Sequence, residues 1–396
     1  MERYKYLIIG GGMAADSAVA GIREIDKSGR ICLICAEPVQ PYERPPLTKG
    51  LWKGTTRLRD IWRRTIEKGA ELRLSKTAQR IDPNEKLVRD SDGETYRYDK
   101  LLLATGGTPR HLPNDVPEIV YYRRFADYKK LRTLARGNRE FGVIGGGFIG
   151  AEISAALAIK KKKVTMIFPD EGIMGTTMPA DLSRFLNSYY EDKGVKIVPG
   201  ERVSRISKPD NGKISVTTDR GRNLKFDVLV AGIGIMPNTE LAREAGLRID
   251  NGIVVDRYLR TSTPDIYAAG DVADFENPHL GKRIRVEHED NANTMGRFAG
   301  LNMAGNQKSY DHLPYYYSDL FDLGYEAVGD LNSKLQIVAN WNEEFREGVI
   351  YYLDQGRVRG VLLWNVWEQV DAARSIIAEP GPFTPRNVMG LLPKGE

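Results

Sequence analysis

Two short glycine-rich segments carry the first sign of chemistry in this chain. Each follows an apolar run and precedes a helical pattern that opens with small residues: YLIIGGGMAADSAVAGIREI near the start, and FGVIGGGFIGAEISAALAI near the middle. Small residues in such a turn let the backbone approach a pyrophosphate, and free N–H groups at the helix start bind its oxygens. The residues that fit this pattern are Gly10, Gly12 and Ala15 in the first segment and Gly145, Gly147 and Gly150 in the second. Both segments are therefore predicted to bind a dinucleotide.

An acidic residue follows each glycine-rich unit, at the tip of the next apolar strand. RICLICAE ends in Glu37, and KVTMIFPD ends in Asp170. A carboxylate at this place hydrogen-bonds the 2′-hydroxyl of an adenosine ribose and repels a 2′-phosphate. Either residue alone could be an ordinary turn acid. Together with the glycines, they favour dinucleotides without a 2′-phosphate at both sites.

A second pair of similar segments repeats in the same order. LLLATGGTPR and VLVAGIGIMPN are each an apolar strand that breaks at a glycine, Gly106 or Gly234, and then reaches a proline. The separation between these two copies nearly equals the separation between the two glycine-rich turns. Such agreement indicates that a whole domain is duplicated.

Composition is that of an ordinary globular protein. The chain has 396 residues, 41% of them hydrophobic and 28% charged, which is enough for two or three domains with cores of their own. No apolar run approaches the roughly 18 residues of a membrane-spanning helix, and MERYKYLIIG leads into a strand without a charged-then-apolar leader. A cytoplasmic location is therefore expected. The net charge of +5 allows an acidic protein partner and is too weak to argue for nucleic acid.

The chain has two cysteines, Cys32 and Cys35, both in the apolar run ICLIC. At this spacing on a strand they point to opposite faces, so they cannot easily form a disulfide or share a metal ion. We expect buried structural thiols and no metal site.

Five motifs give the chain a resemblance to a known family. They are YERPPLTK, VTMIFPDEGIMG, TSTPDIYAAGDVAD, RVEHEDNANTMGRFAGLNMAG and YYYSDLFDLGYEAVG. In this order they resemble the FAD- and NAD-linked pyridine nucleotide oxidoreductases, in the branch of the ferredoxin reductases and apoptosis-inducing factor. The likeness spans residues 1 to about 340. The disulfide reductases of the same family carry redox cysteines near Tyr42, and YERPPLTK has none.

The resemblance implies an α/β fold with two Rossmann-like dinucleotide-binding domains, the second inserted in the first as in glutathione reductase, plus a C-terminal α+β interface domain. The implied bounds are 1–112 and 241–312 for the FAD-binding domain, 113–240 for the NAD-binding domain and 313–396 for the interface or dimerisation domain. Within the last part, the pattern predicts antiparallel strands in LQIVANW, GVIYYLD and RVRGVLLWN, a turn at Gln355-Gly356, and a helix from about Val366 to Ile377.

The resemblance also assigns roles near the flavin. Lys49 matches the family lysine beside flavin N5, and Glu152 matches the glutamate that pairs with it. A carboxylate within about 4 Å would keep a buried lysine charged. The alternatives are a surface lysine and an ordinary acid at a helix start. Arg44 resembles the arginine that reaches the adenosine side of FAD.

Other cofactor contacts follow from the same motifs. Gly270 and Asp271 match the FAD motif in which the aspartate binds a ribitol hydroxyl, and Tyr317 stands where the family has a tryptophan. Further contacts are implied at the two strand ends, Thr105 with Gly106 and Gly234, and at the flavin's pyrimidine end, Glu287 with His288. His288 could instead be a helix cap.

The function implied is an FAD-dependent NADH oxidoreductase that passes electrons to an external acceptor. The leading candidate for this acceptor is a ferredoxin or rubredoxin, and quinones, dyes or oxygen are candidates in its absence. Preference for NADH over NADPH follows from Asp170 and from the lack of arginine between it and Met178. A peroxide, oxygen or coenzyme A disulfide reductase would need the missing cysteine. The remaining alternative is a slow, NADH-sensing flavoprotein like apoptosis-inducing factor, with NADH-linked oligomerisation; a homodimer is allowed.

The charge cluster IKKKKV, residues 159–164, is expected to cover a solvated helix end, where cations suit the helix dipole. An acidic docking partner or nucleotide phosphates are the alternatives.

Overall fold

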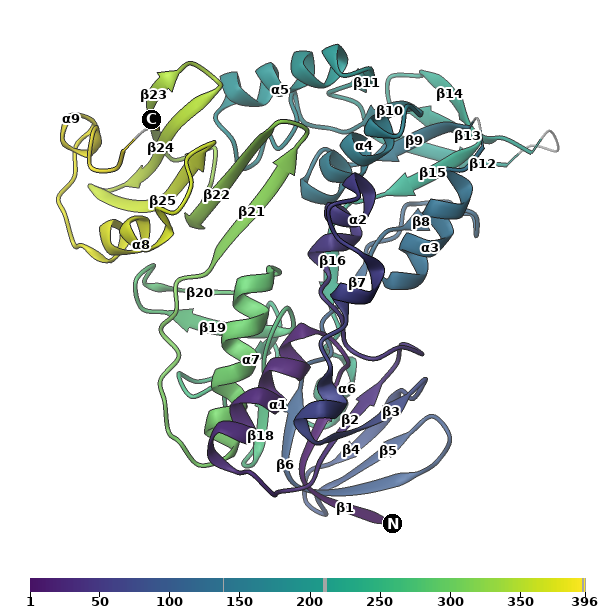
Figure 1. Cartoon of the computed structure of the whole chain (residues 1–396), viewed down its shortest axis with the longest axis vertical. Coiled ribbons are helices and arrows are strands. Elements are labelled where there is room, and N and C mark those ends of the chain that lie inside the picture. The colour runs from purple at the N-terminus through teal and green to yellow at the C-terminus, as the bar shows by residue number, and fades with distance from the viewer. Residues whose placement is uncertain (138, 209–211, 394, 396) are drawn as a thin grey trace. The chain divides into compact units, whose positions relative to one another are not determined.

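The computed structural model describes residues 1–137, 139–208, 212–393 and 395. The chain divides into two compact units, whose elements are labelled in Figure 1. Unit 1 contains Met1–Arg44, Leu58–Thr108 and Met236–Pro314, and unit 2 contains Pro45–Arg57, Pro109–Ile235 and Tyr315–Glu396. This division groups the C-terminal residues with the second glycine-rich turn. The three-domain boundaries given above stay a prediction.

Unit 1 is built around a largely parallel sheet in the order β3-β2-β1-β6-β5-β4, with β18 beside β6. The central strand β1 (Glu2–Ile9) pairs in parallel with β2 and β6 and is buried from Tyr6 to Ile9, as its apolar sequence predicts. The other strands of this sheet are β2 (Ile31–Cys35), β3 (Ala70–Leu74), β4 (Ala78–Asp82), β5 (Leu87–Asp90), β6 (Thr95–Leu103) and β18 (Ile266–Ala268).

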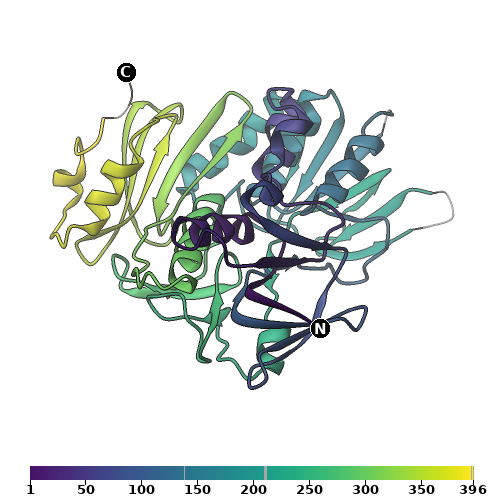
Figure 2. The same ribbon diagram turned by 60° about the horizontal axis from the view of Figure 1, so that its bottom comes forward.

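Helices α1 (Met13–Ile25) and α7 (Glu289–Met303) lie side by side in Figures 1 and 2. Their backbones meet through glycines: a Cβ on Gly21 would lie 2.1 Å from the carbonyl oxygen of Arg297, and one on Gly300 would lie 2.1 Å from that of Ala18. This close packing fixes α1 beside α7. The remaining elements of unit 1 are α6 (Glu240–Glu244), β17 (Ile253–Val254), β19 (Ala273–Asn277), β20 (Lys282–Ile284) and the short 3₁₀ turns Leu58–Ile61 and Thr65–Lys68.

Unit 2 contains a five-stranded sheet in the order β11-β10-β9-β15-β8, whose pairs are parallel. Like β1 and α1, strand β9 leads through a triple glycine into α4, so the predicted repeat is present in the structure. The elements are β8 (Val120–Tyr121), β9 (Glu140–Ile144), β10 (Lys163–Ile167), β11 (Val195–Val198), β15 (Val228–Ala231), α2 (Gly50–Lys53), α3 (Phe125–Leu134), α4 (Phe148–Ile159), α5 (Ala180–Asp192), the antiparallel β12 (Val203–Ser207), β13 (Ile214–Thr218) and β14 (Asn223–Phe226), and a 3₁₀ turn at Pro45–Leu47. Strands β7 (Gly107–Pro109) and β16 (Ile235–Pro237) contain the boundaries between the units.

The C-terminal part of unit 2 is an antiparallel sheet in the order β21-β22-β25-β24-β23. The predicted strands and turn are confirmed, with Gln355 and Gly356 both at positive φ, 48° and 72°. The predicted helix start is wrong: α8 begins at Val370, because Asn365 and Glu368 have φ of 51° and 63°, which a right-handed helix excludes. The elements are β21 (Tyr315–Leu320), β22 (Leu323–Gly329), β23 (Gln336–Glu343), β24 (Glu347–Asp354), β25 (Arg357–Trp364), α8 (Val370–Ala378) and α9 (Pro385–Val388).

Across the described ranges, no helix has both the length and the apolar character needed to cross a bilayer.

Candidate functional site

The first glycine-rich turn, in unit 1, leaves the start of α1 open. Gly10 has φ 138°, and a Cβ there would lie 2.2 Å from the carbonyl oxygen of Ala104, so a larger residue does not fit. Gly12 is the N-cap of α1 and has no side chain to occupy the first N–H groups. Ala15 is fully buried. The turn therefore fits a pyrophosphate, with the helix N–H groups as donors.

Glu37 and Arg44 lie next to this turn. Glu37 Oε2 accepts a hydrogen bond of 2.9 Å from the hydroxyl of Tyr42, and Arg44 Nη2 lies 3.9 Å from Glu37 Oε1. The same Nη2 lies 3.9 Å from the position of a Cβ on Gly12. A guanidinium beside a helix N-terminus suits a phosphate, and a carboxylate beside it suits a ribose hydroxyl. The structure thus brings together three residues predicted from sequence, Gly12, Glu37 and Arg44, and adds Tyr42.

The GD motif lies at the same end of α1. Gly270 has φ 78°, and a Cβ on it would come within 2.9 Å of the Cβ of Ala14, in the first turn of α1. The carbonyl oxygen of Asp271 accepts a 3.0 Å hydrogen bond from Nη1 of Arg285, which is also 2.7 Å from Oε1 of Glu287. Arg285, which was not among the predicted site residues, therefore joins two of them, Asp271 and Glu287.

Arg285 also has a buried polar atom. Its Nε is buried and has no hydrogen-bond partner within the described part of the chain. Because protein atoms cover this Nε, a group bound beside Asp271 would not reach it, and the open start of α1 is what fits a bound cofactor. His288 occupies the N-cap position of α7 without a side-chain capping hydrogen bond, and its predicted contact with the cofactor stays a prediction.

Thr105 and Gly106, at the end of β6, are tied to Asn238. Thr105 Oγ1 donates to the carbonyl oxygen of Asn238 at 2.9 Å, and Asn238 Nδ2 donates to the carbonyl oxygen of Thr105 at 2.8 Å. The N–H of Asn238 donates to the carbonyl oxygen of Gly106 at 2.9 Å. The two residues hold the chain where it leaves the sheet, and their predicted contact with a cofactor stays a prediction.

The second glycine-rich turn, in unit 2, has the same backbone plan. Gly145 has φ 113°, and its Cβ would lie 2.3 Å from the carbonyl oxygen of Gly232. A Cβ on Gly150 would lie 1.9 Å from the carbonyl oxygen of Gly145. Gly147 is the N-cap of α4, and around its Cβ position no atom of the described residues lies within 4 Å. This open helix start fits the phosphates of a second nucleotide.

Asp170 follows β10 and is half-buried, and the exposed Glu171 comes next. The carbonyl oxygen of Asp170 accepts a hydrogen bond of 2.9 Å from the N–H of Gly200. Among the residues that the structure describes, no side chain hydrogen-bonds its carboxylate. Gly234 has φ 89°, and its carbonyl oxygen accepts from the N–H of Arg110 at 2.9 Å.

Unit 2 also contains a buried ion pair. Glu152, in α4, is 4% exposed, and its Oε1 lies 2.6 Å from Nζ of Lys49, whose side chain is 12% exposed. Ser318 Oγ donates to the same oxygen at 2.6 Å, and Thr48 Oγ1 donates to Oε2 at 2.5 Å. Every donor here meets a charged acceptor, which is the condition under which a buried pair is tolerated. Lys49 is therefore no surface lysine, and Glu152 does more than balance a helix dipole.

Tyr317 completes this cluster from strand β21. Its ring centroid lies 5.1 Å from Nζ of Lys49, within the range of a cation–π contact. The next two residues of β21 also contact this region: Ser318 binds Glu152, and Asp319 lies 3.0 Å from Nζ of Lys53. Three successive residues of one strand thus fix the ammonium group of Lys49 and the short helix that follows it.

The segment before Lys49 is held by buried aromatic residues. The carbonyl oxygen of Leu47 accepts hydrogen bonds from Trp52 Nε1 at 2.8 Å and from the hydroxyl of Tyr122 at 2.5 Å. The guanidinium of Arg132, in α3, lies 4.9 Å from the Trp52 ring centroid. Burial raises the pKa of Tyr122 well above its ordinary value, so it stays a neutral donor. These contacts limit the freedom of the loop that positions Lys49.

Sequence reasoning missed Thr48 and Ser318. Thr48 lies inside YERPPLTK, and Ser318 follows Tyr317, so both stood in motifs that were already noted. Nothing in those motifs says that two hydroxyls from distant segments meet at one carboxylate. In the sequence, Thr48 and Ser318 stand out only as polar residues inside runs that are otherwise apolar or proline-rich.

The two cysteines are buried, as expected. Cys32 and Cys35 lie in β2, and burial raises the pKa of each thiol to about 12. A thiol with such a pKa is a poor nucleophile.

The lysine run lies at a solvated helix end, as expected. Helix α4 ends at Ile159, and Lys160, Lys161 and Lys163 are exposed.

Comparison with known proteins identifies the family. Residues 4–296 match the family described as Pyridine nucleotide-disulphide oxidoreductase, and 299–344 with 339–379 match the C-terminal family of apoptosis-inducing factor, mitochondrion-associated. The chain is 37% identical to apoptosis-inducing factor 1 of Dictyostelium discoideum, over 95% of this chain and 79% of that protein. It is 33% identical to the anthranilate 1,2-dioxygenase system ferredoxin–NAD(+) reductase component of Burkholderia cepacia, over 96% and 95%.

A solved structure agrees with these relatives. The covalent putidaredoxin reductase-putidaredoxin complex matches with a TM-score of 0.90 and 28% identity, over 98% of this chain and 95% of that chain. The predicted fold class, resemblance and cofactors are thereby confirmed. The chain belongs to the pyridine nucleotide-disulphide oxidoreductase family and is a flavoprotein oxidoreductase that binds FAD and NAD(H).

Proposed function

We propose that the protein oxidises NADH and passes the electrons through FAD to an external one-electron carrier of the ferredoxin or rubredoxin type. One observation carries the choice of an external acceptor. The two thiols of the chain are buried in β2 and have a pKa of about 12, so neither is suited to accept electrons from a flavin. The likeness to a ferredoxin–NAD(+) reductase component supports a small iron–sulfur carrier as that acceptor.

FAD, when bound, supplies the conversion of a two-electron donor into one-electron transfers. We assign its pyrophosphate to Gly10, Gly12 and Arg44, and its ribose to Glu37. Asp271 would contact the ribitol, and Arg285 would hold the backbone of Asp271 through its carbonyl oxygen. The conformations of Gly10 and Gly270 support this assignment.

Lys49 is assigned a catalytic role with Glu152. Hydride transfer to a flavin builds negative charge, which a fixed ammonium group stabilises better than mobile water does. Glu152 keeps that ammonium charged and in place, because its carboxylate lies 2.6 Å from Nζ. Ser318 and Thr48 position the carboxylate in turn. Tyr317 offers a ring beside the same group.

NADH is the preferred donor in this proposal. Asp170 and Glu171 place two carboxylates after β10, and a 2′-phosphate next to them would be repelled. Gly145, Gly147 and Gly150 would receive the pyrophosphate of NADH. The cytoplasmic location that the sequence leads us to expect stays a prediction.

A carrier-dependent assay tests the proposal. Purified flavin-loaded protein is mixed with NADH, a [2Fe–2S] ferredoxin or a rubredoxin, and cytochrome c as the final acceptor. We expect NADH-dependent cytochrome c reduction to rise at least roughly ten-fold when the carrier is added, and to saturate with carrier concentration. If no carrier changed the rate of NADH-dependent cytochrome c reduction, the assignment of an external carrier would be wrong.

A slow, NADH-sensing flavoprotein is the second candidate, favoured by the C-terminal match to apoptosis-inducing factor. In that case NADH would bleach the flavin, long-wavelength absorbance would persist for minutes, and every carrier would be reduced slowly. NADH would also change the oligomeric state. The same sample, followed without a carrier, separates the two candidates.

A further inference from the structure

The turn between β13 and β14, in unit 2, carries an arginine that lies beside the acidic residues after β10. Arg220 is exposed, and its Nη2 lies 3.2 Å from the position of a Cβ on Gly200. Oε1 of Glu171 lies 3.5 Å from the same position. The N–H of Gly200 donates to the carbonyl oxygen of Asp170 at 2.9 Å. The structure thus brings a cation from a distant segment next to Asp170 and Glu171.

Hydrogen bonds hold this turn against the loop that follows β11. Oε2 of Glu201, which is buried, accepts from Thr218 Oγ1 at 2.6 Å, and its Oε1 accepts from Arg222 Nη2 at 2.8 Å. The N–H of Asp219 donates to the carbonyl oxygen of Arg202 at 2.9 Å, and the N–H of Arg202 donates to Oδ1 of Asp219 at 3.0 Å. The backbone of the arginine at the tip of the turn is therefore fixed in place beside the loop.

The guanidinium of Arg220 is available to a ligand. It makes no hydrogen bond or ion pair with any residue that the structure describes. An arginine can bind a phosphate through two parallel N–H bonds. In dinucleotide sites a carboxylate binds the 2′-hydroxyl of the adenosine ribose, whereas a nearby arginine accommodates a 2′-phosphate. This chain has both kinds of residue beside the end of β10.

We propose that Arg220 is a specificity-determining residue, which lets the chain use NADPH as a second, weaker donor by binding the 2′-phosphate that Asp170 and Glu171 repel. The inference rests on the proposed function, which assigns the adenosine ribose of NADH to Asp170. NADH stays the preferred donor, because two carboxylates face one guanidinium, and Arg220 limits how large that preference is. The sequence has no arginine directly after Asp170, and Arg220 comes instead from the antiparallel strands of the same unit.

Two ligands that differ only in a 2′-phosphate test the proposal. Adenosine 5′-monophosphate and adenosine 2′,5′-bisphosphate are titrated into the flavin-loaded protein by isothermal titration calorimetry, so that bound FAD occupies its own site. Arg220→Ala should weaken binding of the bisphosphate by about ten-fold and of the monophosphate by less than about two-fold, because one charged contact is lost. Arg220→Lys keeps the charge and should retain part of the bisphosphate affinity. In Arg220→Ala, kcat/KM for NADPH should also fall by about ten-fold, with that for NADH little changed.

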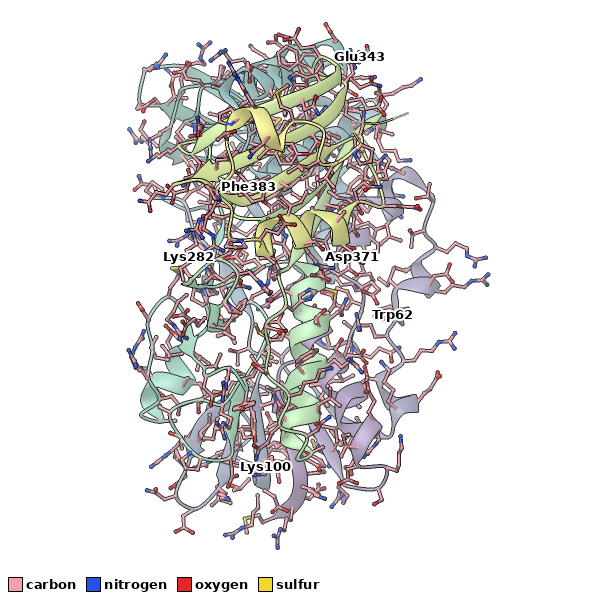
Figure 3. The ribbon with its side chains drawn as sticks, turned by 90° about the vertical axis from the view of Figure 1, so that its left-hand side faces the viewer. Trp62, Lys100, Lys282, Glu343, Asp371 and Phe383 are labelled. Carbon is pink, nitrogen blue, oxygen red and sulfur yellow. The ribbon has the colours of Figure 1, made fainter. Side chains whose placement is uncertain are left out.

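Two further variants control for the loss of a positive charge. Arg205→Ala removes an exposed arginine from β12 of the same unit, and Lys282→Ala removes an exposed lysine from β20 of unit 1, labelled in Figure 3. Both should leave the two affinities unchanged. If Arg220→Ala bound the bisphosphate as tightly as the unchanged chain does, or lost affinity for both ligands equally, the proposal would be overturned. An unchanged chain that binds neither ligand would overturn the proposed NADH site as well, so the two failures are distinguishable.

Discussion

The two glycine-rich turns share a backbone plan and differ in how the acidic residue beside each is held. In unit 1, Glu37 accepts a hydrogen bond from Tyr42 and lies 3.9 Å from Arg44. In unit 2, the carboxylate of Asp170 has no side-chain hydrogen bond to any residue that the structure describes. A site whose polar groups are fixed in advance binds tightly, because less entropy is lost on binding. The difference suits a resident FAD in unit 1 and an exchangeable NADH in unit 2.

The third small residue of each turn differs as well. A Cβ on Gly150 would lie 1.9 Å from the carbonyl oxygen of Gly145, whereas Ala15 carries a Cβ and is fully buried. Helix α4 therefore approaches its own turn more closely than α1 does. The two turns thus share a motif and differ in their local packing.

The largest effect should come from adding a Cβ at the first glycine of each turn. Gly10→Ala and Gly145→Ala both place a Cβ close to a carbonyl oxygen at positive φ, at a cost of about 3 kcal/mol or more. We expect Gly10→Ala to lose its flavin, with affinity lowered by about 100-fold or more. Gly145→Ala should keep its flavin and lose reduction by NADH.

Flavin content, from the absorbance ratio of the purified protein, and anaerobic reduction by NADH measure the two effects. Gly137→Ala is the matched control, because Gly137 lies outside both glycine-rich turns and, apart from its chain neighbours, the nearest described atom to its Cβ would be Nε of Arg139 at 3.7 Å. If Gly145→Ala also came off the column colourless, the separation of the two sites would be refuted.

A smaller effect, of about 100-fold on the rate of flavin reduction by NADH, is expected for Lys49→Ala. The variant loses the buried cation but none of the residues assigned to flavin retention, so its flavin content should be unchanged. Lys53→Ala removes a neighbouring lysine that pairs with Asp319 and should change the rate little. Stopped-flow absorbance gives both rates, and equal rates for the two variants would remove Lys49 from the catalytic assignment.

Replacing Glu37 or Asp170 by alanine should change a different property by about ten-fold in each variant. Glu37→Ala removes a charged hydrogen bond to the flavin cofactor, and Asp170→Ala removes the repulsion of a 2′-phosphate. Glu37→Ala should weaken flavin binding and leave the preference for NADH over NADPH intact. Asp170→Ala should narrow that preference and leave flavin binding intact. Steady-state kcat/KM with both nucleotides, beside flavin titration of the apoprotein, measures the pair. A change in nucleotide preference for Glu37→Ala would contradict the comparison.

The smallest effects are expected at the hydroxyls around Glu152. Ser318→Ala and Thr48→Val each remove one donor to the carboxylate, which should lower the rate of flavin reduction by about three- to ten-fold. Thr48→Ser keeps the hydroxyl and should retain most of the rate. The same stopped-flow experiment applies, with KM for NADH measured separately. If Thr48→Ser were as slow as Thr48→Val, the hydroxyl would not be what positions Glu152.

Local patterns predicted the parts of this molecule that local chemistry determines. The turns at Gly10 and Gly145, the hairpin turn at Gln355-Gly356 and the buried cysteines follow from short-range periodicity and from backbone conformations that favour glycine. The start of α8 was placed too early, because no local pattern marks the positive φ at Glu368, whose N–H donates to Oε2 of Glu326 in another strand. The meeting of Ser318 and Thr48 at one carboxylate joins segments that no periodicity connects, so sequence alone could not show it.

In the proposed reaction, a resident flavin takes electrons from NADH and releases them to an external carrier. Double-mixing stopped-flow spectroscopy under anaerobic conditions follows both steps: flavin-loaded protein is mixed with one equivalent of NADH, then with an excess of a [2Fe–2S] ferredoxin. We expect NADH to bleach the flavin absorbance roughly ten-fold faster than NADPH does, or more, and ferredoxin to restore it after the second mixing. A flavin that NADH does not bleach, or whose absorbance returns no faster with ferredoxin than with buffer, would show that the proposed electron path is wrong.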